Sequence, residues 1–138
     1  MMKHVLPAAL VAILVATMPG STARAAPLLE CTCTYGGESW TLTASPTTDP
    51  YLVVAVKVGE RFRFRMVWVA DPPAEAGVNL YAYYPGADGA PVVIHQSKYR
   101  PPFPAVGKGA PYGFTGLQFV YELRTASEFQ FWCGWREP

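Results

Sequence analysis

The stretch 51-YLVVAVKVGERFRFRMVWVA-70 carries the strongest fold signal in the chain. Its first part is apolar and rich in β-branched residues, and after Glu60 apolar and charged residues alternate. The alternation places Phe62, Phe64, Met66 and Trp68 on one face, and Arg61, Arg63 and Arg65 on the other. This pattern is typical of a strand with one buried and one solvated face. Gly59 separates the two runs, so we expect them to form a β-hairpin.

Similar runs, separated by turn residues, follow along the rest of the chain. Strands are expected over residues 28–35, 38–44, 78–84, 90–96, 115–123 and 128–135. In the fifth of these runs the alternation places Leu117, Phe119, Tyr121 and Leu123 on one face. Prolines interrupt the stretch 99–113 and should prevent strand pairing there. About eight hairpin-rich strands predict an all-β fold, a small antiparallel sandwich.

The N-terminus has the pattern of a secretory signal peptide. Lys3 supplies a positive start, and the apolar run from Val5 to Met18 is 14 residues long. A run of this length suits a signal peptide and is too short for a stable membrane span, which needs about 20 residues. The small residues Ala23 and Ala25 flank Arg24 as a signal peptidase requires. We therefore expect residues 1–25 to be removed, leaving 26–138 as a single domain without a membrane span, in the periplasm or secreted.

Charge limits the partners of the mature domain. Removing Lys3 and Arg24 reduces the basic residues from 11 to 9 against 10 acids, a net charge of −1. A nearly neutral domain lacks the basic surface that nucleic-acid binding requires. The expected partner is therefore an envelope or extracellular protein, or a glycan, and no nucleic acid.

The three cysteines predict one structural disulfide. Cys31 and Cys33 are two residues apart, so on a strand they share a face, and Cys133 lies near the other end of the chain. An oxidising compartment favours a bridge from Cys133 to one of the pair. Cys33 is the expected partner because Cys31 lies nearer the new terminus, where fraying is greater. Cys31 remains the alternative, and the third cysteine is then a buried free thiol or pairs between chains.

A small extracytoplasmic hydrolase or a metal-handling protein is the alternative interpretation. It would use Cys31, Cys33 and His95, the last being the only histidine after residue 25. However, the C-x-C spacing differs from the usual zinc and dithiol motifs. No G-x-S-x-G, H-E-x-x-H or P-loop motif is present. The sequence therefore predicts no catalytic residue, no metal and no cofactor.

Two groups of residues are candidates for binding. The first is the aromatic set Tyr99, Phe103 and Tyr112 in the proline-rich stretch, where a restricted backbone would lose little entropy on binding. The second is the positive stripe of Arg61, Arg63 and Arg65, which suits an acidic partner or anionic glycan. We expect the aromatic set to contribute more, since aromatic anchors typically outweigh exposed charge contacts. The sequence thus predicts a non-catalytic exported binding protein.

Overall fold

The computed structural model describes residue 20 and residues 25–104 and 109–137. The expected signal peptide, apart from Gly20 and Ala25, lies outside the described residues. The strands are β1 (Leu28–Tyr35), β2 (Glu38–Ala44), β3 (Val56–Val58), β4 (Phe62–Val69), β5 (Gly77–Pro85), β6 (Pro91–Tyr99), β7 (Gln118–Glu122) and β8 (Ser127–Arg136). One short 3₁₀ helix, η1 (Pro50–Leu52), precedes β3.

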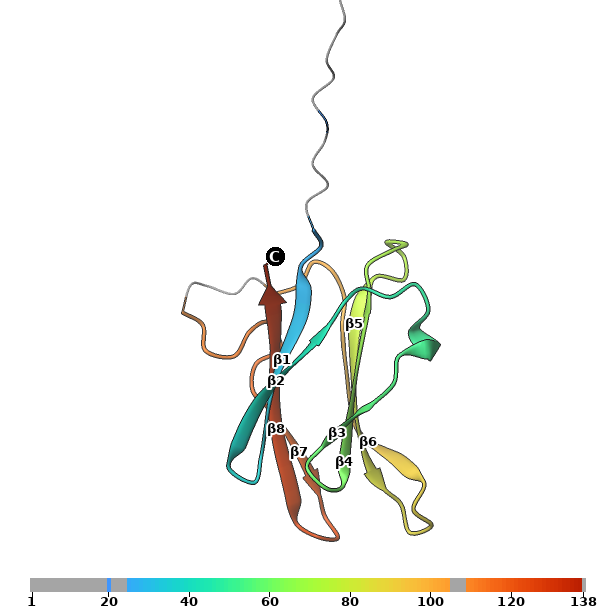
Figure 1. The fold of residues 1–138 in the computed structure, drawn as a ribbon, viewed down its shortest axis with the longest axis vertical. Helices are drawn as coiled ribbons and strands as arrows, with labels where there is room; N and C mark the ends of the chain where they lie inside the picture. Colours follow the sequence, from blue (N-terminus) through green and yellow to red (C-terminus); the bar gives the residue numbers. More distant parts are fainter. Residues whose placement is uncertain (1–19, 21–24, 105–108, 138) are drawn as a thin grey trace, which may run out of the picture.

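The strands form two four-stranded antiparallel sheets, which face each other as a sandwich (Figure 1). The first sheet has the order β2-β1-β8-β7, and the second has the order β3-β4-β5-β6. The first sheet contains two pairings of sequence-adjacent strands, β1–β2 and β7–β8, and the second contains three, β3–β4, β4–β5 and β5–β6. The pairing of β1 with β8 joins the two ends of the domain. The expected all-β sandwich is confirmed.

The strand expected over residues 51–58 is wrong in its first part. Only Val56–Val58 pairs with β4, while Pro50–Leu52 forms the 3₁₀ helix, and the side chain of Asp49 accepts a hydrogen bond from the backbone nitrogen of Tyr51. The side chain of Arg65 donates to the carbonyl oxygens of Pro50 and Val53. These contacts fix the backbone outside the ladder, which β-branched composition alone does not reveal.

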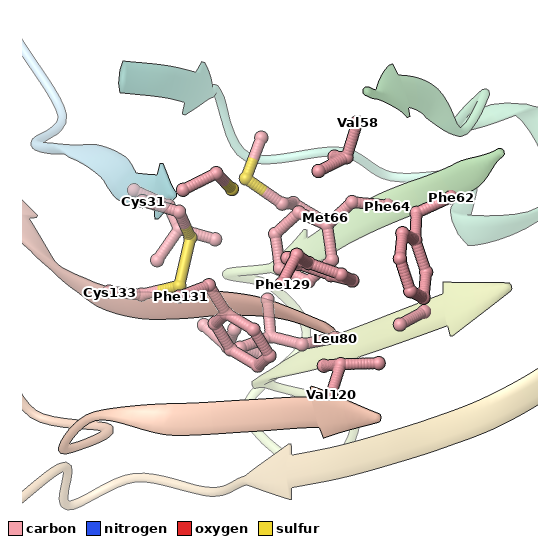
Figure 2. Packing of buried hydrophobic residues seen from close by; sticks show 14 of the residues in the cluster. Cys31, Val58, Phe62, Phe64, Met66, Leu80, Val120, Phe129, Phe131 and Cys133 are labelled. Carbon is pink, nitrogen blue, oxygen red and sulfur yellow. A yellow bond between two sulfur atoms is a disulfide. The ribbon is translucent and has the colours of Figure 1, made fainter. Parts of the chain in front are cut away.

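Phenylalanines from both sheets form the centre of the core (Figure 2). Phe62 and Phe64 of β4 meet Phe129 and Phe131 of β8, with ring centroids 4.7–5.9 Å apart across the two sheets. All four rings are at most 1% exposed. Burying aromatic rings in this way is a large favourable term in the stability of a small domain. The face predicted from the alternation in residues 62–68 is therefore the buried one.

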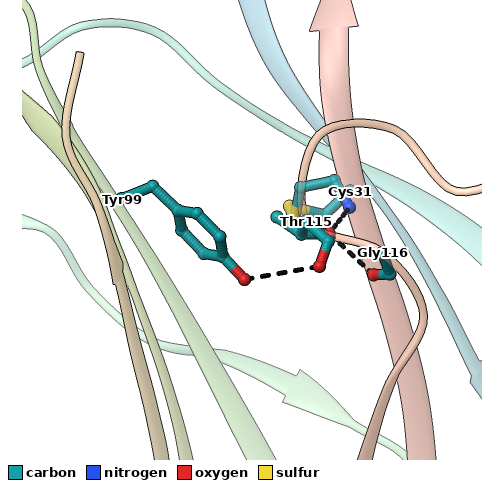
Figure 3. The surroundings of a disulfide bond; sticks show 5 residues. Cys31, Tyr99, Thr115 and Gly116 are labelled. Carbon is teal, nitrogen blue, oxygen red and sulfur yellow. Dashed lines mark hydrogen bonds between the residues drawn. A yellow bond between two sulfur atoms is a disulfide. The ribbon is translucent and has the colours of Figure 1, made fainter. Parts of the chain in front are cut away.

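A disulfide joins Cys31 of β1 to Cys133 of β8, a sequence separation of 102 residues (Figure 2). Thr115 and Tyr99 lie beside it (Figure 3). Cys33 is free. This corrects the expected Cys33–Cys133 pairing. The register places Cys31 directly opposite Cys133, whereas Cys33 lies opposite Phe131. Fraying does not disfavour Cys31, because β1 lies between β2 and β8 and is hydrogen-bonded on both sides.

Candidate binding surfaces

The predicted aromatic set is mostly turned toward the core. Phe103 is half-buried, with its ring 5.3 Å from that of Phe114 and 5.0 Å from that of Trp135. Tyr99 also packs on the core, 5.4 Å from Phe114. Tyr112 is the exposed member at 43%. Tyr99 and Phe103 therefore cover one end of the core, and of these three aromatic residues only Tyr112 presents much of its ring to solvent.

The predicted arginine stripe is divided by different local contacts. Arg65 supports the 3₁₀ helix and lies 5.4 Å from the ring centroid of Tyr81. Arg61 donates to the hydroxyl of Tyr84, 3.3 Å away. Arg63 is exposed on the outer face of β4. Arg61 and Arg63 thus remain available at the surface, whereas Arg65 has a structural role.

The residues of the alternative metal site are not assembled as ligands. Cys31 is part of the disulfide and cannot act as a thiolate ligand. Burial raises the pKa of the Cys33 thiol to about 12, so this thiol stays protonated and unreactive. His95 lies edge-on to Phe131 at 5.5 Å, and burial lowers its pKa. Within residues 25–104 and 109–137 no cluster of three or more His, Cys, Asp or Glu side chains is placed to hold a metal ion.

A polar cluster that the sequence did not reveal lies at the opposite end of the sandwich from Phe103. Glu122 turns inward from β7 and accepts hydrogen bonds from Arg124 Nε at 2.9 Å and from the Thr125 hydroxyl at 2.8 Å. The Thr125 hydroxyl also lies 2.8 Å from that of Tyr84 on β5, a contact that lowers the pKa of Tyr84. The side chain of Arg124 donates to the carbonyl oxygen of Pro85 at 2.7 Å. The cluster therefore links the β7–β8 turn to the second sheet.

Glu122 makes the stability of the domain dependent on acid pH. Desolvation alone would raise its pKa, but hydrogen bonds from Arg124 and Thr125 outweigh it and lower the pKa from 4.5 to about 2. The folded state then binds fewer protons than the unfolded state between these values. The stabilisation is complete above 4.5 and is lost as the pH falls toward about 2.

We expect Glu122→Gln to remove much of this acid sensitivity. The variant should be less stable than the wild type at neutral pH and should lose less stability between pH values of about 7 and 3, which urea unfolding at both pH values measures. Glu128→Gln, which removes the same charge from an exposed position, leaves the cluster intact. An equal loss in wild type and Glu122→Gln would contradict the assignment.

The most exposed apolar side chains of the first sheet lie on and just after β7. Phe119, Tyr121 and Leu123 are 57%, 49% and 83% exposed. The buried positions of β7 are instead Val120 and Glu122. On the neighbouring strand β8, Trp132 shares the outer face and lies 6.5 Å from the ring of Tyr112. The alternation in residues 117–123 thus describes a surface and not part of the core.

β7 differs from the other three strands at the sheet edges. β3 is only three residues long, and β6 begins with Pro91, carries Lys98 and has a register shift in its pairing with β5. β2 exposes Ser39, Thr41 and Thr43. Short length, proline, charge and irregularity are the usual protections against edge-to-edge pairing. β7 pairs with β8 alone, has no proline and carries no charge on its outer face; it is five residues long, and its one charged residue, Glu122, points inward.

Comparison of the chain with models of protein families, with curated proteins and with solved structures gives no match. In the part of the chain that the structure describes, no helix is long and apolar enough to cross a membrane.

Proposed function

We propose that this chain is an exported, non-catalytic binding protein that accepts an extended segment of a partner protein along the free edge of β7. The observation that carries the proposal is the exposure of Phe119 and Tyr121 on an edge strand whose outer face carries no charge and no proline. Exposed apolar groups of this kind mark interaction sites in soluble proteins. An added strand would use the unpaired backbone for affinity and alternate side chains for specificity.

Export is supported by two independent features. The N-terminal 25 residues have the signal-peptide pattern, and the Cys31–Cys133 disulfide is compatible with an oxidising compartment. Cleavage after Ala25 would place the domain in the periplasm or outside the cell. An envelope or extracellular protein is therefore the class of partner that the domain would meet.

A separate protein fits β7 better than a second copy of this chain. Two copies pairing only through the five-residue β7 would bury far less than the about 800 Å² per partner of a stable interface. A larger partner that supplies the strand can also cover Trp132 and Tyr112 on the outer face. We therefore assign the edge to a different protein.

The test begins with a photo-crosslinking amino acid at position 119 and, as a matched control, at Thr41 on β2 of the same sheet. The partner crosslinked in the native envelope is identified and purified. Its affinity is then measured for variants of this domain in which strand residues are replaced by lysine. Phe119→Lys with Tyr121→Lys should weaken binding at least about 30-fold, because two anchors are lost and the edge becomes charged. The control variant, Thr41→Lys with Thr43→Lys, should change the affinity for the partner less than about threefold.

Three outcomes would overturn the proposal. One is loss of binding in the β2 variant while the β7 variant binds normally. The second is a crosslink from position 119 only to another copy of this chain, with a dimer seen by sedimentation. The third is a glycan as the sole crosslinked species.

A further inference from the structure

A small cavity on the second sheet has a concentration of positive charge. It has a volume of about 180 Å³, and its charged lining residues are Lys57, Arg61, Arg63 and Glu60. Three cations against one carboxylate leave an excess of two positive charges in a domain whose predicted mature net charge is −1. The volume lies below the about 300–1,000 Å³ of pockets for drug-sized ligands and suits one small charged group.

Two of these cations face each other without a compensating partner. Lys57 on β3 is directly opposite Arg63 on β4, and both side chains are exposed. Neither forms an ion pair with any described residue. Like charges directly opposite in a sheet destabilise the pairing of the strands. An anion seated between the two would turn this repulsion into attraction for both.

The wall of the cavity is held in place before any ligand arrives. The β5–β6 turn supplies Pro85, Gly89 and Pro91 to the lining. This turn is closed by hydrogen bonds from Gly86 N to the carbonyl oxygen of Ala90 at 2.7 Å, and from Ala90 N to the Asp88 carboxylate at 3.0 Å. Asp88 is thus engaged with its own turn and does not line the cavity.

Tyrosine rings border the cations on the same face of the sheet. Tyr83 on β5 lies directly opposite Arg63 and lines the cavity. Its ring stacks with that of Tyr81 at a centroid distance of 6.3 Å and an interplanar angle of 25°. A flat aromatic surface beside a charged pocket can contact the apolar face of a ring that carries the anionic group.

We propose that this cavity binds a sulfate or phosphate ester carried on a sugar ring. Lys57, Arg61 and Arg63 would hold the oxyanion, since guanidinium groups donate paired hydrogen bonds to such groups. Tyr83 would contact the ring. The site lies on the second sheet and is independent of the β7 edge on the first.

Calorimetric titration at constant ionic strength tests the site with galactose 6-sulfate, galactose 6-phosphate, galactose and inorganic sulfate. We expect at least one of the two esters to bind at least about tenfold more tightly than galactose or inorganic sulfate. Lys57→Gln with Arg63→Gln should weaken ester binding at least about tenfold, whereas Lys98→Gln should change it less than about twofold. Lys98 is an exposed cation on β6 of the same sheet and does not line the cavity.

Folding is controlled by thermal melts without ligand. The double variant should melt at or above the wild-type temperature, because a like-charge pair is removed. A lower melting temperature would contradict the repulsion argument. Galactose or inorganic sulfate binding as tightly as the tighter-binding ester, or an equal effect of Lys98→Gln, would overturn the proposal.

Discussion

Replacing both Cys31 and Cys133 by alanine is expected to lower the free energy of unfolding by at least about 4–5 kcal/mol. The bridge closes a loop with a sequence separation of 102 residues, and loops of this length give about that stabilisation in the chain-entropy treatment. Both cysteines are changed together so that Cys31 cannot form a new bridge with Cys33. Guanidinium unfolding of protein purified from an oxidising compartment measures the loss.

Cys33→Ala is the matched control for the disulfide. It removes a buried sulfur from the same strand but keeps the bridge, so its cost should be about 1 kcal/mol. If the double variant and this control lose the same stability, the disulfide is not the source of the effect. If reductant leaves the wild-type unfolding curve unchanged, the same conclusion follows.

The large contribution expected from the disulfide connects the stability of the fold with the proposed extracytoplasmic compartment. Small domains have a net stability of about 5–15 kcal/mol, so losing the bridge would remove a large share of it. A chain retained in a reducing cytoplasm would lack that contribution. Folding of this domain and its export are therefore expected to depend on each other.

The alternation in the sequence correctly predicted which side chains share a face of a strand. It was a poorer guide to which of the two faces is buried. In β4 the arginines mark the solvated side, so Phe62 and Phe64 could be assigned to the core. β7 has no such marker, because its one charged residue, Glu122, is buried. Its direct partners, Arg124 and Thr125, are close in the sequence, but Thr125 is also bonded to Tyr84, which lies 41 positions earlier than Thr125 and on the other sheet.

The disulfide partner could not be decided from spacing, because Cys31 and Cys33 lie on the same face of β1. The choice depends on the register between β1 and β8, which is set by pairing across nearly the whole length of the domain. The candidate binding residues were missed for a similar reason. Proline and aromatic content pointed to Phe103, but only packing shows that its ring is directed toward Trp135.

The close contact of Gly113 with β8 makes this glycine the position where a single methyl group should be most damaging. Its φ is +53°, a conformation that costs a non-glycine residue about 1–2 kcal/mol. A Cβ at this position would also lie 2.1 Å from the carbonyl oxygen of Cys133, a backbone atom of a strand tied down by the disulfide. We expect Gly113→Ala to lower the free energy of unfolding by about 2–5 kcal/mol, since overpacking adds about 1–3 kcal/mol to the cost of the backbone conformation.

Gly116→Ala separates the two contributions, because Gly116 has a φ of +70° but no atom within 4 Å of its added Cβ. It should cost only the about 1–2 kcal/mol of the backbone conformation, and denaturant unfolding of the two variants gives the difference. Equal losses would mean that β8 moves to accommodate the added methyl group.

The substitution at Gly113 should also affect binding, because the neighbouring Tyr112 lies beside Trp132 on the outer face. Displacing Gly113 from β8 should therefore also weaken a partner that covers this face, whereas Gly116→Ala should bind normally.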